Sequence, residues 1–226
     1  MVRENLAYCR ERIRAAALRA GRTPEEITLV AVTKGVQPEL IFEAIDCGIE
    51  DIGENRIQEA LLKYEELNAY ARQRGRCLTW HMVGHLQTNK AKDAVRLFDL
   101  IHSVDSLRLA QELDRQAVRI GKVQDVLIEV KTSPEATKFG FLPEEVEGWV
   151  REIASLKNIR VKGLMTIAPQ VDDPQKARPY FHTLTELKDK INRLTILSMG
   201  MTDDLEAAVE EGTSMVRVGR GIFGQR

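Results

Sequence analysis

Residues 27–54, ITLVAVTKGVQPELIFEAIDCGIEDIGE, contain the pattern that decides the fold. The stretch opens with a short, β-branched and apolar run over 27–33, which is typical of a buried strand. Pro38 stands where the first turn of a helix tolerates a missing N–H, and Gly48 stands where that helix should end. A second short run follows at 51–53. The stretch therefore predicts one strand–helix–strand unit.

The same unit recurs along the whole chain. Eight strands are predicted, and they cover Ile27–Thr33, Asp51–Gly53, Thr79–Val83, Leu100–Val104, Val123–Val130, Val161–Ile167, Leu194–Leu197 and Met215–Val218. Strands that alternate with helices pair in parallel through right-handed crossovers. Eight parallel strands can close into a barrel with a filled interior. We therefore predict an α/β fold, a single (β/α)₈ TIM barrel over residues 1–226, with an open doubly wound sheet as the alternative.

Residues 1–22 predict an extra amphipathic helix before the first strand. Its apolar residues follow a helical stripe made of Val2, Leu6, Cys9, Ile13 and Ala17. The segment is rich in arginine, as transit peptides are, but Glu4 and Glu11 interrupt the basic run and transit peptides are poor in acidic residues. We expect this helix to pack on the barrel. Further along the chain, Asp203 stands three residues before Glu206 and predicts the capped start of a late helix.

The composition narrows the class of protein. A length of 226 residues suits one α/β barrel or at most two small domains. Lysine and arginine total 33 against 34 aspartate and glutamate, and a net charge of −1 gives no reason to expect nucleic acid or an anionic membrane as partner. Aromatic residues make up only 5% of the chain, so we expect an aliphatic core, as barrel interiors filled with valine, isoleucine and leucine usually are.

Cysteine usage and hydropathy indicate an intracellular protein. Cys9, Cys47 and Cys77 are widely spaced, odd in number and form no C-x-x-C pattern, which is typical of a reduced compartment. No apolar run approaches the roughly 18 residues that a membrane span needs. We therefore expect a cytoplasmic protein. The mixed charge and the self-contained barrel favour a monomer.

Polar side chains gather where the predicted strands end, which is the face where TIM barrels carry their active sites. The residues at or just after these ends include Lys34, Glu54, Asn55, His81, Gly84, His85, Ser103, Asp105, Lys131, Thr132, Met165, Thr166, Ser198, Gly200, Arg217, Gly219 and Arg220. This clustering predicts a binding or active site on that rim.

Lys34 directly follows an apolar strand, so we predict that its amine is desolvated. A desolvated, neutral lysine amine can attack an aldehyde to form a Schiff base. The competing interpretation is a strand-end lysine whose charged end reaches the solvent. Position along the chain does not by itself decide between the two.

The last two strand ends predict a phosphate site. In TIM barrels, the loops after strands seven and eight commonly bind phosphate through backbone N–H groups. Residues 198–202 and 216–221 supply glycines that permit close approach, and Ser198 and Arg220 supply donors. Arg217 sits in an apolar strand and points either outward or inward. An inward arginine needs an acceptor, which a pyridine nitrogen provides.

The remaining polar residues do not indicate a further binding site. His81 and His85 are four apart but lie on either side of a strand end, and His102 and His182 look isolated, so no metal site is expected. Asp203 beside Asp204 is interpreted as capping of a helix dipole. No G-x-G-x-x-G dinucleotide pattern occurs.

Together these residues resemble the pyridoxal phosphate homeostasis proteins. The motifs that carry the resemblance are VAVTK (30–34), GENRIQE (53–59), WHMVGHLQTNK (80–90), SVD (103–105), KFG (138–140), GLMT (163–166), SMGM (198–201) and VRVGRGIFG (216–224). They run in order from the first strand to the end of the chain. The resemblance implies a barrel like the N-terminal domain of alanine racemase.

The resemblance also implies a role for each matching residue. Lys34 matches the lysine that holds pyridoxal 5′-phosphate as an aldimine, and Arg217 matches the arginine that faces the pyridine nitrogen. Three residues match positions around the ring, namely Asn55, His81 and Met165. Three more fall in the stretches that hold the phosphate, namely Ser198, Gly219 and Arg220. Where relatives often carry Thr-Ala after the glycine, this chain has Arg220-Gly221, which removes a hydroxyl contact but leaves the backbone donor.

The function that the resemblance implies is vitamin B6 homeostasis without established turnover, with PLP-dependent apoenzymes as possible acceptors. An arginine beside the pyridine nitrogen cannot keep it protonated, which weakens the ring as an electron sink. Alanine racemase also needs a second domain to bring an opposite base, and this sequence ends two residues after Gly224. The alternatives are a weak PLP-dependent racemase or lyase, for which His81 is the candidate base, and a Schiff-base aldolase acting on a sugar phosphate.

Overall fold

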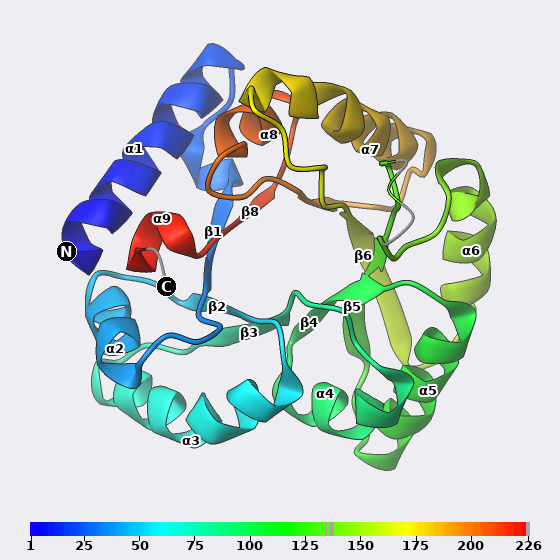
Figure 1. Ribbon diagram of the computed structural model, residues 1–226. Coiled ribbons are helices and arrows are strands. Elements are labelled where there is room, and N and C mark those ends of the chain that lie inside the picture. The colour runs from blue at the N-terminus through cyan, green and yellow to red at the C-terminus, as the bar shows by residue number, and fades with distance from the viewer. Residues whose placement is uncertain (134, 136–137, 225–226) are drawn as a thin grey trace.

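The computed structural model describes residues 1–133, 135 and 138–224. Eight parallel strands close into a barrel in the order of the sequence, which confirms the predicted TIM barrel and rules out the open sheet (Figure 1). The strands are β1 (Thr28–Val32), β2 (Asp51–Glu54), β3 (Thr79–Met82), β4 (Leu100–Val104), β5 (Gln124–Glu129), β6 (Ile159–Met165), β7 (Ile196–Ser198) and β8 (Met215–Val218). Each strand begins and ends within two residues of its predicted bounds.

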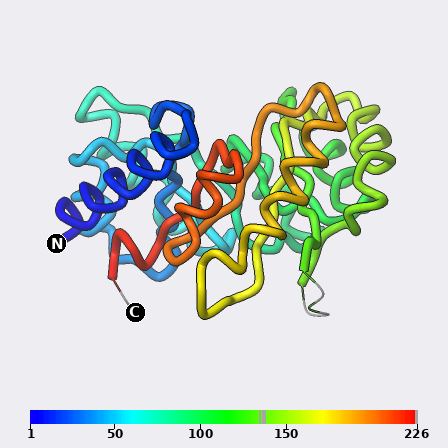
Figure 2. The backbone as a smooth tube through the Cα atoms, turned by 90° about the horizontal axis from the view of Figure 1, so that it is seen from above, coloured from blue at the N-terminus to red at the C-terminus, as the bar shows by residue number. Residues whose placement is uncertain are grey.

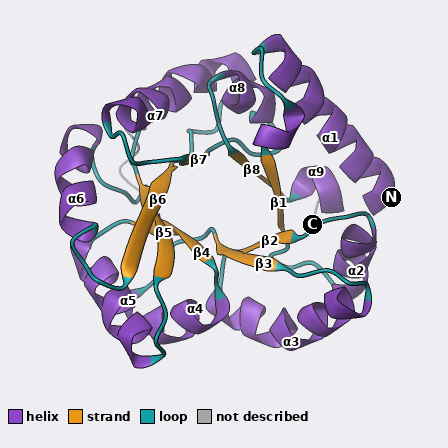
Figure 3. Ribbon diagram, turned by 180° about the vertical axis from the view of Figure 1, so that it is seen from behind, coloured by secondary structure: helices purple, strands orange, loops and turns teal. Residues whose placement is uncertain are grey.

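Helices surround the barrel, as Figures 1 and 3 show from opposite sides. The α-helices are α1 (Val2–Arg19), α2 (Pro38–Asp46), α3 (Ile57–Gln73), α4 (Ala91–Leu97), α5 (Leu107–Arg119), α6 (Val146–Ile153), α7 (Arg178–Lys190), α8 (Leu205–Glu210) and α9 (Arg220–Phe223). The 3₁₀ turns are η1 (Pro24–Glu26), η2 (Thr88–Lys90), η3 (Pro143–Glu145) and η4 (Pro174–Ala177). Pro38 opens α2, and Gly48 after it has a φ of +87°, as predicted.

The predicted N-terminal helix is α1, and it packs against α8 and α9 of the barrel's last segment. Its whole predicted stripe is buried. Arg12 forms two hydrogen bonds with the Glu206 carboxylate, at 2.6 and 2.7 Å, and the Asn5 side chain donates to the Ile222 carbonyl at 2.9 Å. Figure 2 shows the two ends of the described chain on the same side of the molecule. The first helix therefore covers the last part of the barrel.

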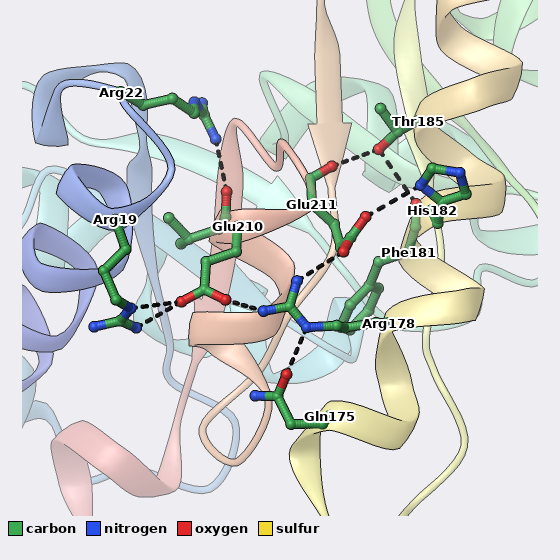
Figure 4. Close-up of polar contacts among 10 residues, drawn as sticks. Arg19, Arg22, Gln175, Arg178, Phe181, His182, Thr185, Glu210 and Glu211 are labelled. Carbon is green, nitrogen blue, oxygen red and sulfur yellow. Dashed lines mark hydrogen bonds and ion pairs between the residues drawn. The ribbon is translucent and has the colours of Figure 1, made fainter.

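Polar contacts also tie α8 to helices on both sides (Figure 4). Glu210 pairs with Arg19 of α1 and with Arg178 of α7, and Arg178 also reaches Glu211 at 2.7 Å. The Thr185 hydroxyl of α7 donates to the Glu211 carbonyl at 2.6 Å. These contacts hold the short α8, and so fix the loop that precedes it at the rim.

The start of α8 differs from the prediction. Asp203 does not cap this helix, because α8 begins at Leu205 and the carboxylate of Asp203 lies 2.5 Å from the Arg220 guanidinium. The Asp204 carboxylate instead accepts the Met201 N–H at 2.5 Å. The two aspartates thus fold the loop between β7 and α8 back onto itself and onto the loop after β8.

Gly163 lies where β6 and β7 approach most closely. A Cβ at this position would lie 1.9 Å from the Ile196 carbonyl oxygen and 2.6 Å from the Ile196 carbonyl carbon. Because these are backbone atoms of the neighbouring strand, they cannot move aside as a side chain can. We expect Gly163→Ala to lower the free energy of unfolding by about 1–3 kcal/mol, measured by urea denaturation.

Gly148 of α6 provides the matched control, because a Cβ there meets nothing within 4 Å. Gly148→Ala should leave the protein as stable as the native chain, or more stable by up to about 1 kcal/mol, since alanine favours a helix over glycine. A Gly163→Ala protein as stable as Gly148→Ala would contradict the close approach of β6 and β7.

None of the helices in residues 1–133 and 138–224 has both the length and the apolar character needed to cross a membrane.

Candidate cofactor site

Lys34 lies at the carboxyl end of β1, and its side chain is exposed. Its amine makes no hydrogen bond or ion pair with any residue that the structure describes. The predicted desolvation of this amine is therefore wrong, because Lys34 lies in the exposed turn that follows β1 and the buried Thr33. The amine stands free at the rim, open to an incoming ligand.

The backbone on both sides of Lys34 is held firmly. The hydroxyl of the buried Thr33 donates to the Glu54 carboxylate at 2.7 Å, and the Lys63 amine donates to the Thr33 carbonyl at 2.8 Å. The Gly35 N–H donates to Glu59 at 2.7 Å. The flexible side chain of Lys34 therefore starts from a fixed position.

Glu54 is the buried centre of that support. Its side chain is fully buried, and one carboxylate oxygen accepts from the Lys63 amine at 2.9 Å. Burial raises the pKa of Glu54, while the charge of Lys63 and the hydrogen bond from Thr33 oppose that rise. The sequence placed Glu54 at the rim but gave no sign of Lys63, which comes from α3 and folds back onto the strand end.

Arg217 of β8 points into the barrel, so of the two orientations left open by the sequence the inward one is correct. One terminal nitrogen of the guanidinium, Nη1, donates to the Ser198 hydroxyl at 2.5 Å, and the other, Nη2, donates to the Thr166 carbonyl at 2.9 Å. Burial lowers the pKa of Arg217 to about 10, which still leaves it charged at neutral pH. β8 is the neighbour of β1, with Arg217 beside Val30, four residues before Lys34.

Ser198 and His81 lie deeper than the rim. The Ser198 hydroxyl contacts both Arg217 and His102 Nδ1, the latter at 2.9 Å, so it is engaged inside the barrel and not free to donate to a phosphate. His81 is 1% exposed, and its ring contacts His102 and Asp51, each at 2.9 Å. The interpretation of His102 as isolated is therefore wrong.

The buried core is largely aliphatic, as predicted, although the barrel interior also holds polar side chains. An apolar layer does exist, in which Leu100, Leu127 and Met165 pack with Ile196 and Met215. Polar side chains occupy the rest of the interior around it, namely His81, His102, Glu129, Ser198 and Arg217. Buried polar groups are tolerated where they pair with one another, as most of these do.

The two glycine-containing loops after β7 and β8 meet, as the phosphate-site prediction requires. Gly200 has a φ of +91°, and its carbonyl accepts the Arg217 N–H at 3.0 Å. The Gly221 N–H donates to the Thr202 hydroxyl at 3.1 Å. Thr202, half-buried between the loops, went unnoticed in the sequence because a threonine in a turn is common.

Gly219 precedes α9 and is partly exposed, whereas the Arg220 side chain is exposed and paired with Asp203. The Arg220 guanidinium is therefore turned toward the loop after β7. Its backbone N–H, in the first turn of α9, has no acceptor within that helix.

Glu129 is a rim residue that the sequence analysis missed. It ends β5, is 7% exposed, and one carboxylate oxygen has no hydrogen-bond partner in the described part of the chain. Burial and the charge of Asp105 raise the pKa of Glu129 to about 7, against the opposing effect of Arg217. Together with Lys131 and Lys138 it lines a pocket of about 120 Å³. An acid inside the apolar run 126–130 was the available signal.

The loops after β2, β3 and β4 complete the rim. A Cβ on Gly84 would lie 2.5 Å from the Asn55 carbonyl oxygen, so only glycine permits this approach of the two loops. His85 pairs with Asp105 at 3.0 Å and stacks on Phe139 at 3.7 Å between ring centroids. Within the described residues, no three histidine, cysteine, aspartate or glutamate side chains lie together in a way that would hold a metal ion.

Comparison with known proteins agrees with this geometry. The sequence model of the alanine racemase N-terminal domain matches residues 5–226. A pyridoxal phosphate homeostasis protein of Aquifex aeolicus is 44% identical over 99% of this chain and 97% of its own length, and one of Escherichia coli K12 is 39% identical over 100% and 97%. The chain belongs to the pyridoxal phosphate homeostasis proteins.

Solved structures extend the comparison to this family's fold. PipY of Synechococcus elongatus PCC7942, solved with PLP bound, is 37% identical with a TM-score of 0.82, covering 99% of this chain and 100% of PipY. Alanine racemase of Clostridium difficile has a TM-score of 0.70 at 18% identity, and this chain covers 56% of it. The second likeness shows a shared fold alone.

The residues present fit pyridoxal phosphate. The exposed amine of Lys34 matches its aldehyde, the buried guanidinium of Arg217 matches its ring nitrogen, and the joined loops at Gly200 and Gly219 match its phosphate. Neighbouring strands β1, β7 and β8 bring all three together.

Proposed function

We propose that this chain binds pyridoxal 5′-phosphate through Lys34 and holds it for supply to other proteins, as part of vitamin B6 homeostasis. The observation that carries the proposal is the free amine of Lys34 on a fixed backbone, on the strand next to the one that presents Arg217. When bound, the aldehyde of this cofactor joins a lysine amine reversibly as a Schiff base.

Each remaining contact is assigned to a chain residue. Arg217 donates to the pyridine nitrogen, and because a guanidinium does not give up its proton near neutral pH, the ring nitrogen stays unprotonated. The loops at Gly200–Thr202 and Gly219–Gly221 receive the phosphate through backbone N–H groups and the Thr202 hydroxyl. Asn55, half-buried just after β2, is proposed to flank the ring, whereas Met165 is buried in the apolar layer and is given no contact with it.

Holding rather than turnover is supported by the position of His81. Both of its ring nitrogens have partners inside the barrel, and 1% exposure leaves no path to a ligand on the rim. The candidate base of the racemase alternative is therefore not within reach of a substrate. The relatives that are 39% and 44% identical over nearly the full length of both chains carry the name of homeostasis proteins, not of enzymes.

The proposal includes the setting in which the protein works. We infer a cytoplasmic monomer that passes its cofactor to PLP-dependent apoenzymes. Cys9, Cys47 and Cys77 are all unpaired, which suits a reducing compartment. An exposed attachment lysine suits release to another protein.

The test is an absorbance spectrum of the purified protein with pyridoxal phosphate, before and after borohydride reduction, followed by peptide mapping. A visible band that disappears on reduction, with the reduced cofactor on the peptide that contains Lys34, is the expected result. A colourless protein, or a label elsewhere, would refute the proposal. Incubation with single L-amino acids should yield no D-enantiomer, whereas turnover would establish the racemase alternative.

A further inference from the structure

A continuous line of hydrogen-bonded side chains crosses the barrel interior from β2 to β8. The contacts are Asp51 Oδ1 to His81 Nε2 at 2.9 Å, His81 Nδ1 to His102 Nε2 at 2.9 Å, His102 Nδ1 to Ser198 Oγ at 2.9 Å, and Ser198 Oγ to Arg217 Nη1 at 2.5 Å. We call these five residues the interior file. Its three middle members are at most 1% exposed, so bulk water does not reach them.

The interior file joins the two ends of the barrel. Asp51 is the first residue of β2, its side chain is 28% exposed, and it lines a pocket of about 520 Å³ together with Thr28 and Glu50, which lie at the amino ends of the strands. Arg217 contacts the Thr166 carbonyl, directly after the carboxyl end of β6. A change at the amino-terminal end can therefore reach the cofactor rim through four hydrogen bonds.

The direction of these hydrogen bonds follows from the chemistry of the two ends. A guanidinium has only donors, so Ser198 accepts from Arg217, and an ionised carboxylate only accepts, so His81 Nε2 carries a hydrogen. A neutral His81 then accepts at Nδ1 from the Nε2–H of His102. The bare Nδ1 of His102 in turn accepts the hydroxyl hydrogen of Ser198. The hydrogens of the three middle residues are therefore assigned to His81 Nε2, His102 Nε2 and Ser198 Oγ.

A doubly protonated His81 is the other arrangement, and it would reverse the two middle hydrogen bonds. It would also bury a second full positive charge in the interior that already holds Arg217, at a high cost in solvation. Burial above all, and also the positive charge of Arg217, holds the pKa of His102 well below its usual range. His102 is therefore neutral, and the cost of burying a second charge beside Arg217 favours a neutral His81 as well.

We propose that Asp51, His81, His102 and Ser198 are positioning residues that fix the Arg217 guanidinium through one directed line of hydrogen bonds. Since Nη1 is held by Ser198 and Nη2 by Thr166, the plane of the guanidinium is set, and so is the direction of its remaining N–H groups. The importance for the cofactor rests on the proposed function, in which Arg217 faces the pyridine nitrogen.

The first test reads the protons directly, in the protein without cofactor. Nitrogen-15 NMR of the histidine side chains should find His81 and His102 both neutral and both protonated at Nε2. A hydrogen on Nδ1 of either ring, or a doubly protonated His81, overturns the directed line. This result does not depend on whether the protein binds pyridoxal phosphate.

The second test breaks the line at its far end. Asp51→Ala should speed hydrogen exchange of the Arg217 side chain and release of bound pyridoxal phosphate by about three- to tenfold each, the effect of one lost net hydrogen bond. Asp51→Asn keeps an acceptor for His81 and should stay within about twofold of the native rates. Glu50→Ala changes the neighbouring residue in the same pocket and should leave both rates unchanged.

An Asp51→Ala protein that behaves as Glu50→Ala does would overturn the proposal. Ser198→Ala interrupts the line next to Arg217 and must raise the same exchange rate, which decides the matter if Asp51→Ala fails to fold. A protein that never binds pyridoxal phosphate would refute the proposed function, whereas the histidine tautomers and the Arg217 exchange rate would still decide the role of the interior file.

Discussion

Replacing Lys34 by alanine is expected to abolish covalent attachment of pyridoxal phosphate. The amine of Lys34 is the group proposed to join the aldehyde, and among the described residues no other rim side chain combines an exposed amine with a place just after the strand beside Arg217. The visible band and the mass of the borohydride-reduced adduct should both fall to background. Because Lys34 is exposed, its loss should leave the fold and the thermal transition unchanged.

Two further variants separate chemistry from charge. Lys34→Arg keeps the positive charge, but a guanidinium stays protonated and cannot attack the aldehyde, so it should also lose the adduct. Lys157→Ala removes an exposed lysine just before the amino end of β6, at the end of the barrel opposite the rim, and should bind as the native protein does. A full adduct in Lys34→Ala would move the attachment to another lysine, with Lys131 and Lys138 the next to map.

The fold followed from the sequence because its evidence is local. The run 27–33 is apolar and β-branched, Pro38 marks the start of a helix and Gly48 its end, and this order repeats through all eight strands. Each signal depends on neighbours within a few residues. The predicted cap at Asp203 was wrong because its carboxylate pairs with Arg220, which is seventeen positions away in the chain. A local sequence pattern does not indicate such a distant partner.

The sequence predicted which residues gather at the rim, but not how deeply each side chain lies in the barrel. Parallel strands bring their carboxyl ends together, so Lys34, Arg217 and the glycine loops could be assigned to one rim. How far each side chain lies below that rim depends on the register between strands, which the sequence does not contain. His81 and Ser198 were thus predicted to contact the cofactor, whereas the structure pairs both with His102 in the barrel interior.

Register also explains why the pairing of polar residues inside the barrel was not predicted. Composition gives an average over the chain, and few aromatic residues were consistent with a core of valine, isoleucine and leucine. The polar residues of the interior come from different strands, each of which looks apolar by itself. Their mutual pairing appears only when β3, β4, β7 and β8 are closed into one barrel.

Removing the Glu129 carboxylate is expected to stabilise the protein at alkaline pH. Burial and Asp105 raise the pKa of Glu129 to about 7 in the folded chain, from 4.5 as the ordinary value. A group whose pKa is raised by folding contributes stability that is full below its unfolded pKa and is lost as the pH rises through its folded pKa. As the pH rises from about 4.5 to about 7, the free energy of unfolding of the native chain therefore falls, by up to about 3 kcal/mol.

Glu129→Gln is neutral at every pH, so it escapes this loss. We expect its free energy of unfolding, relative to the native chain, to rise by about 2.5 kcal/mol between about pH 5 and pH 8, measured by urea denaturation without cofactor. Glu144→Gln changes an exposed glutamate and should show no such dependence. A difference that stays flat with pH would mean that Glu129 is ionised in the folded protein at pH 5, with Arg217 outweighing burial. A rise of the expected size would establish that Glu129 is a buried, protonated carboxyl in the folded protein at pH 5.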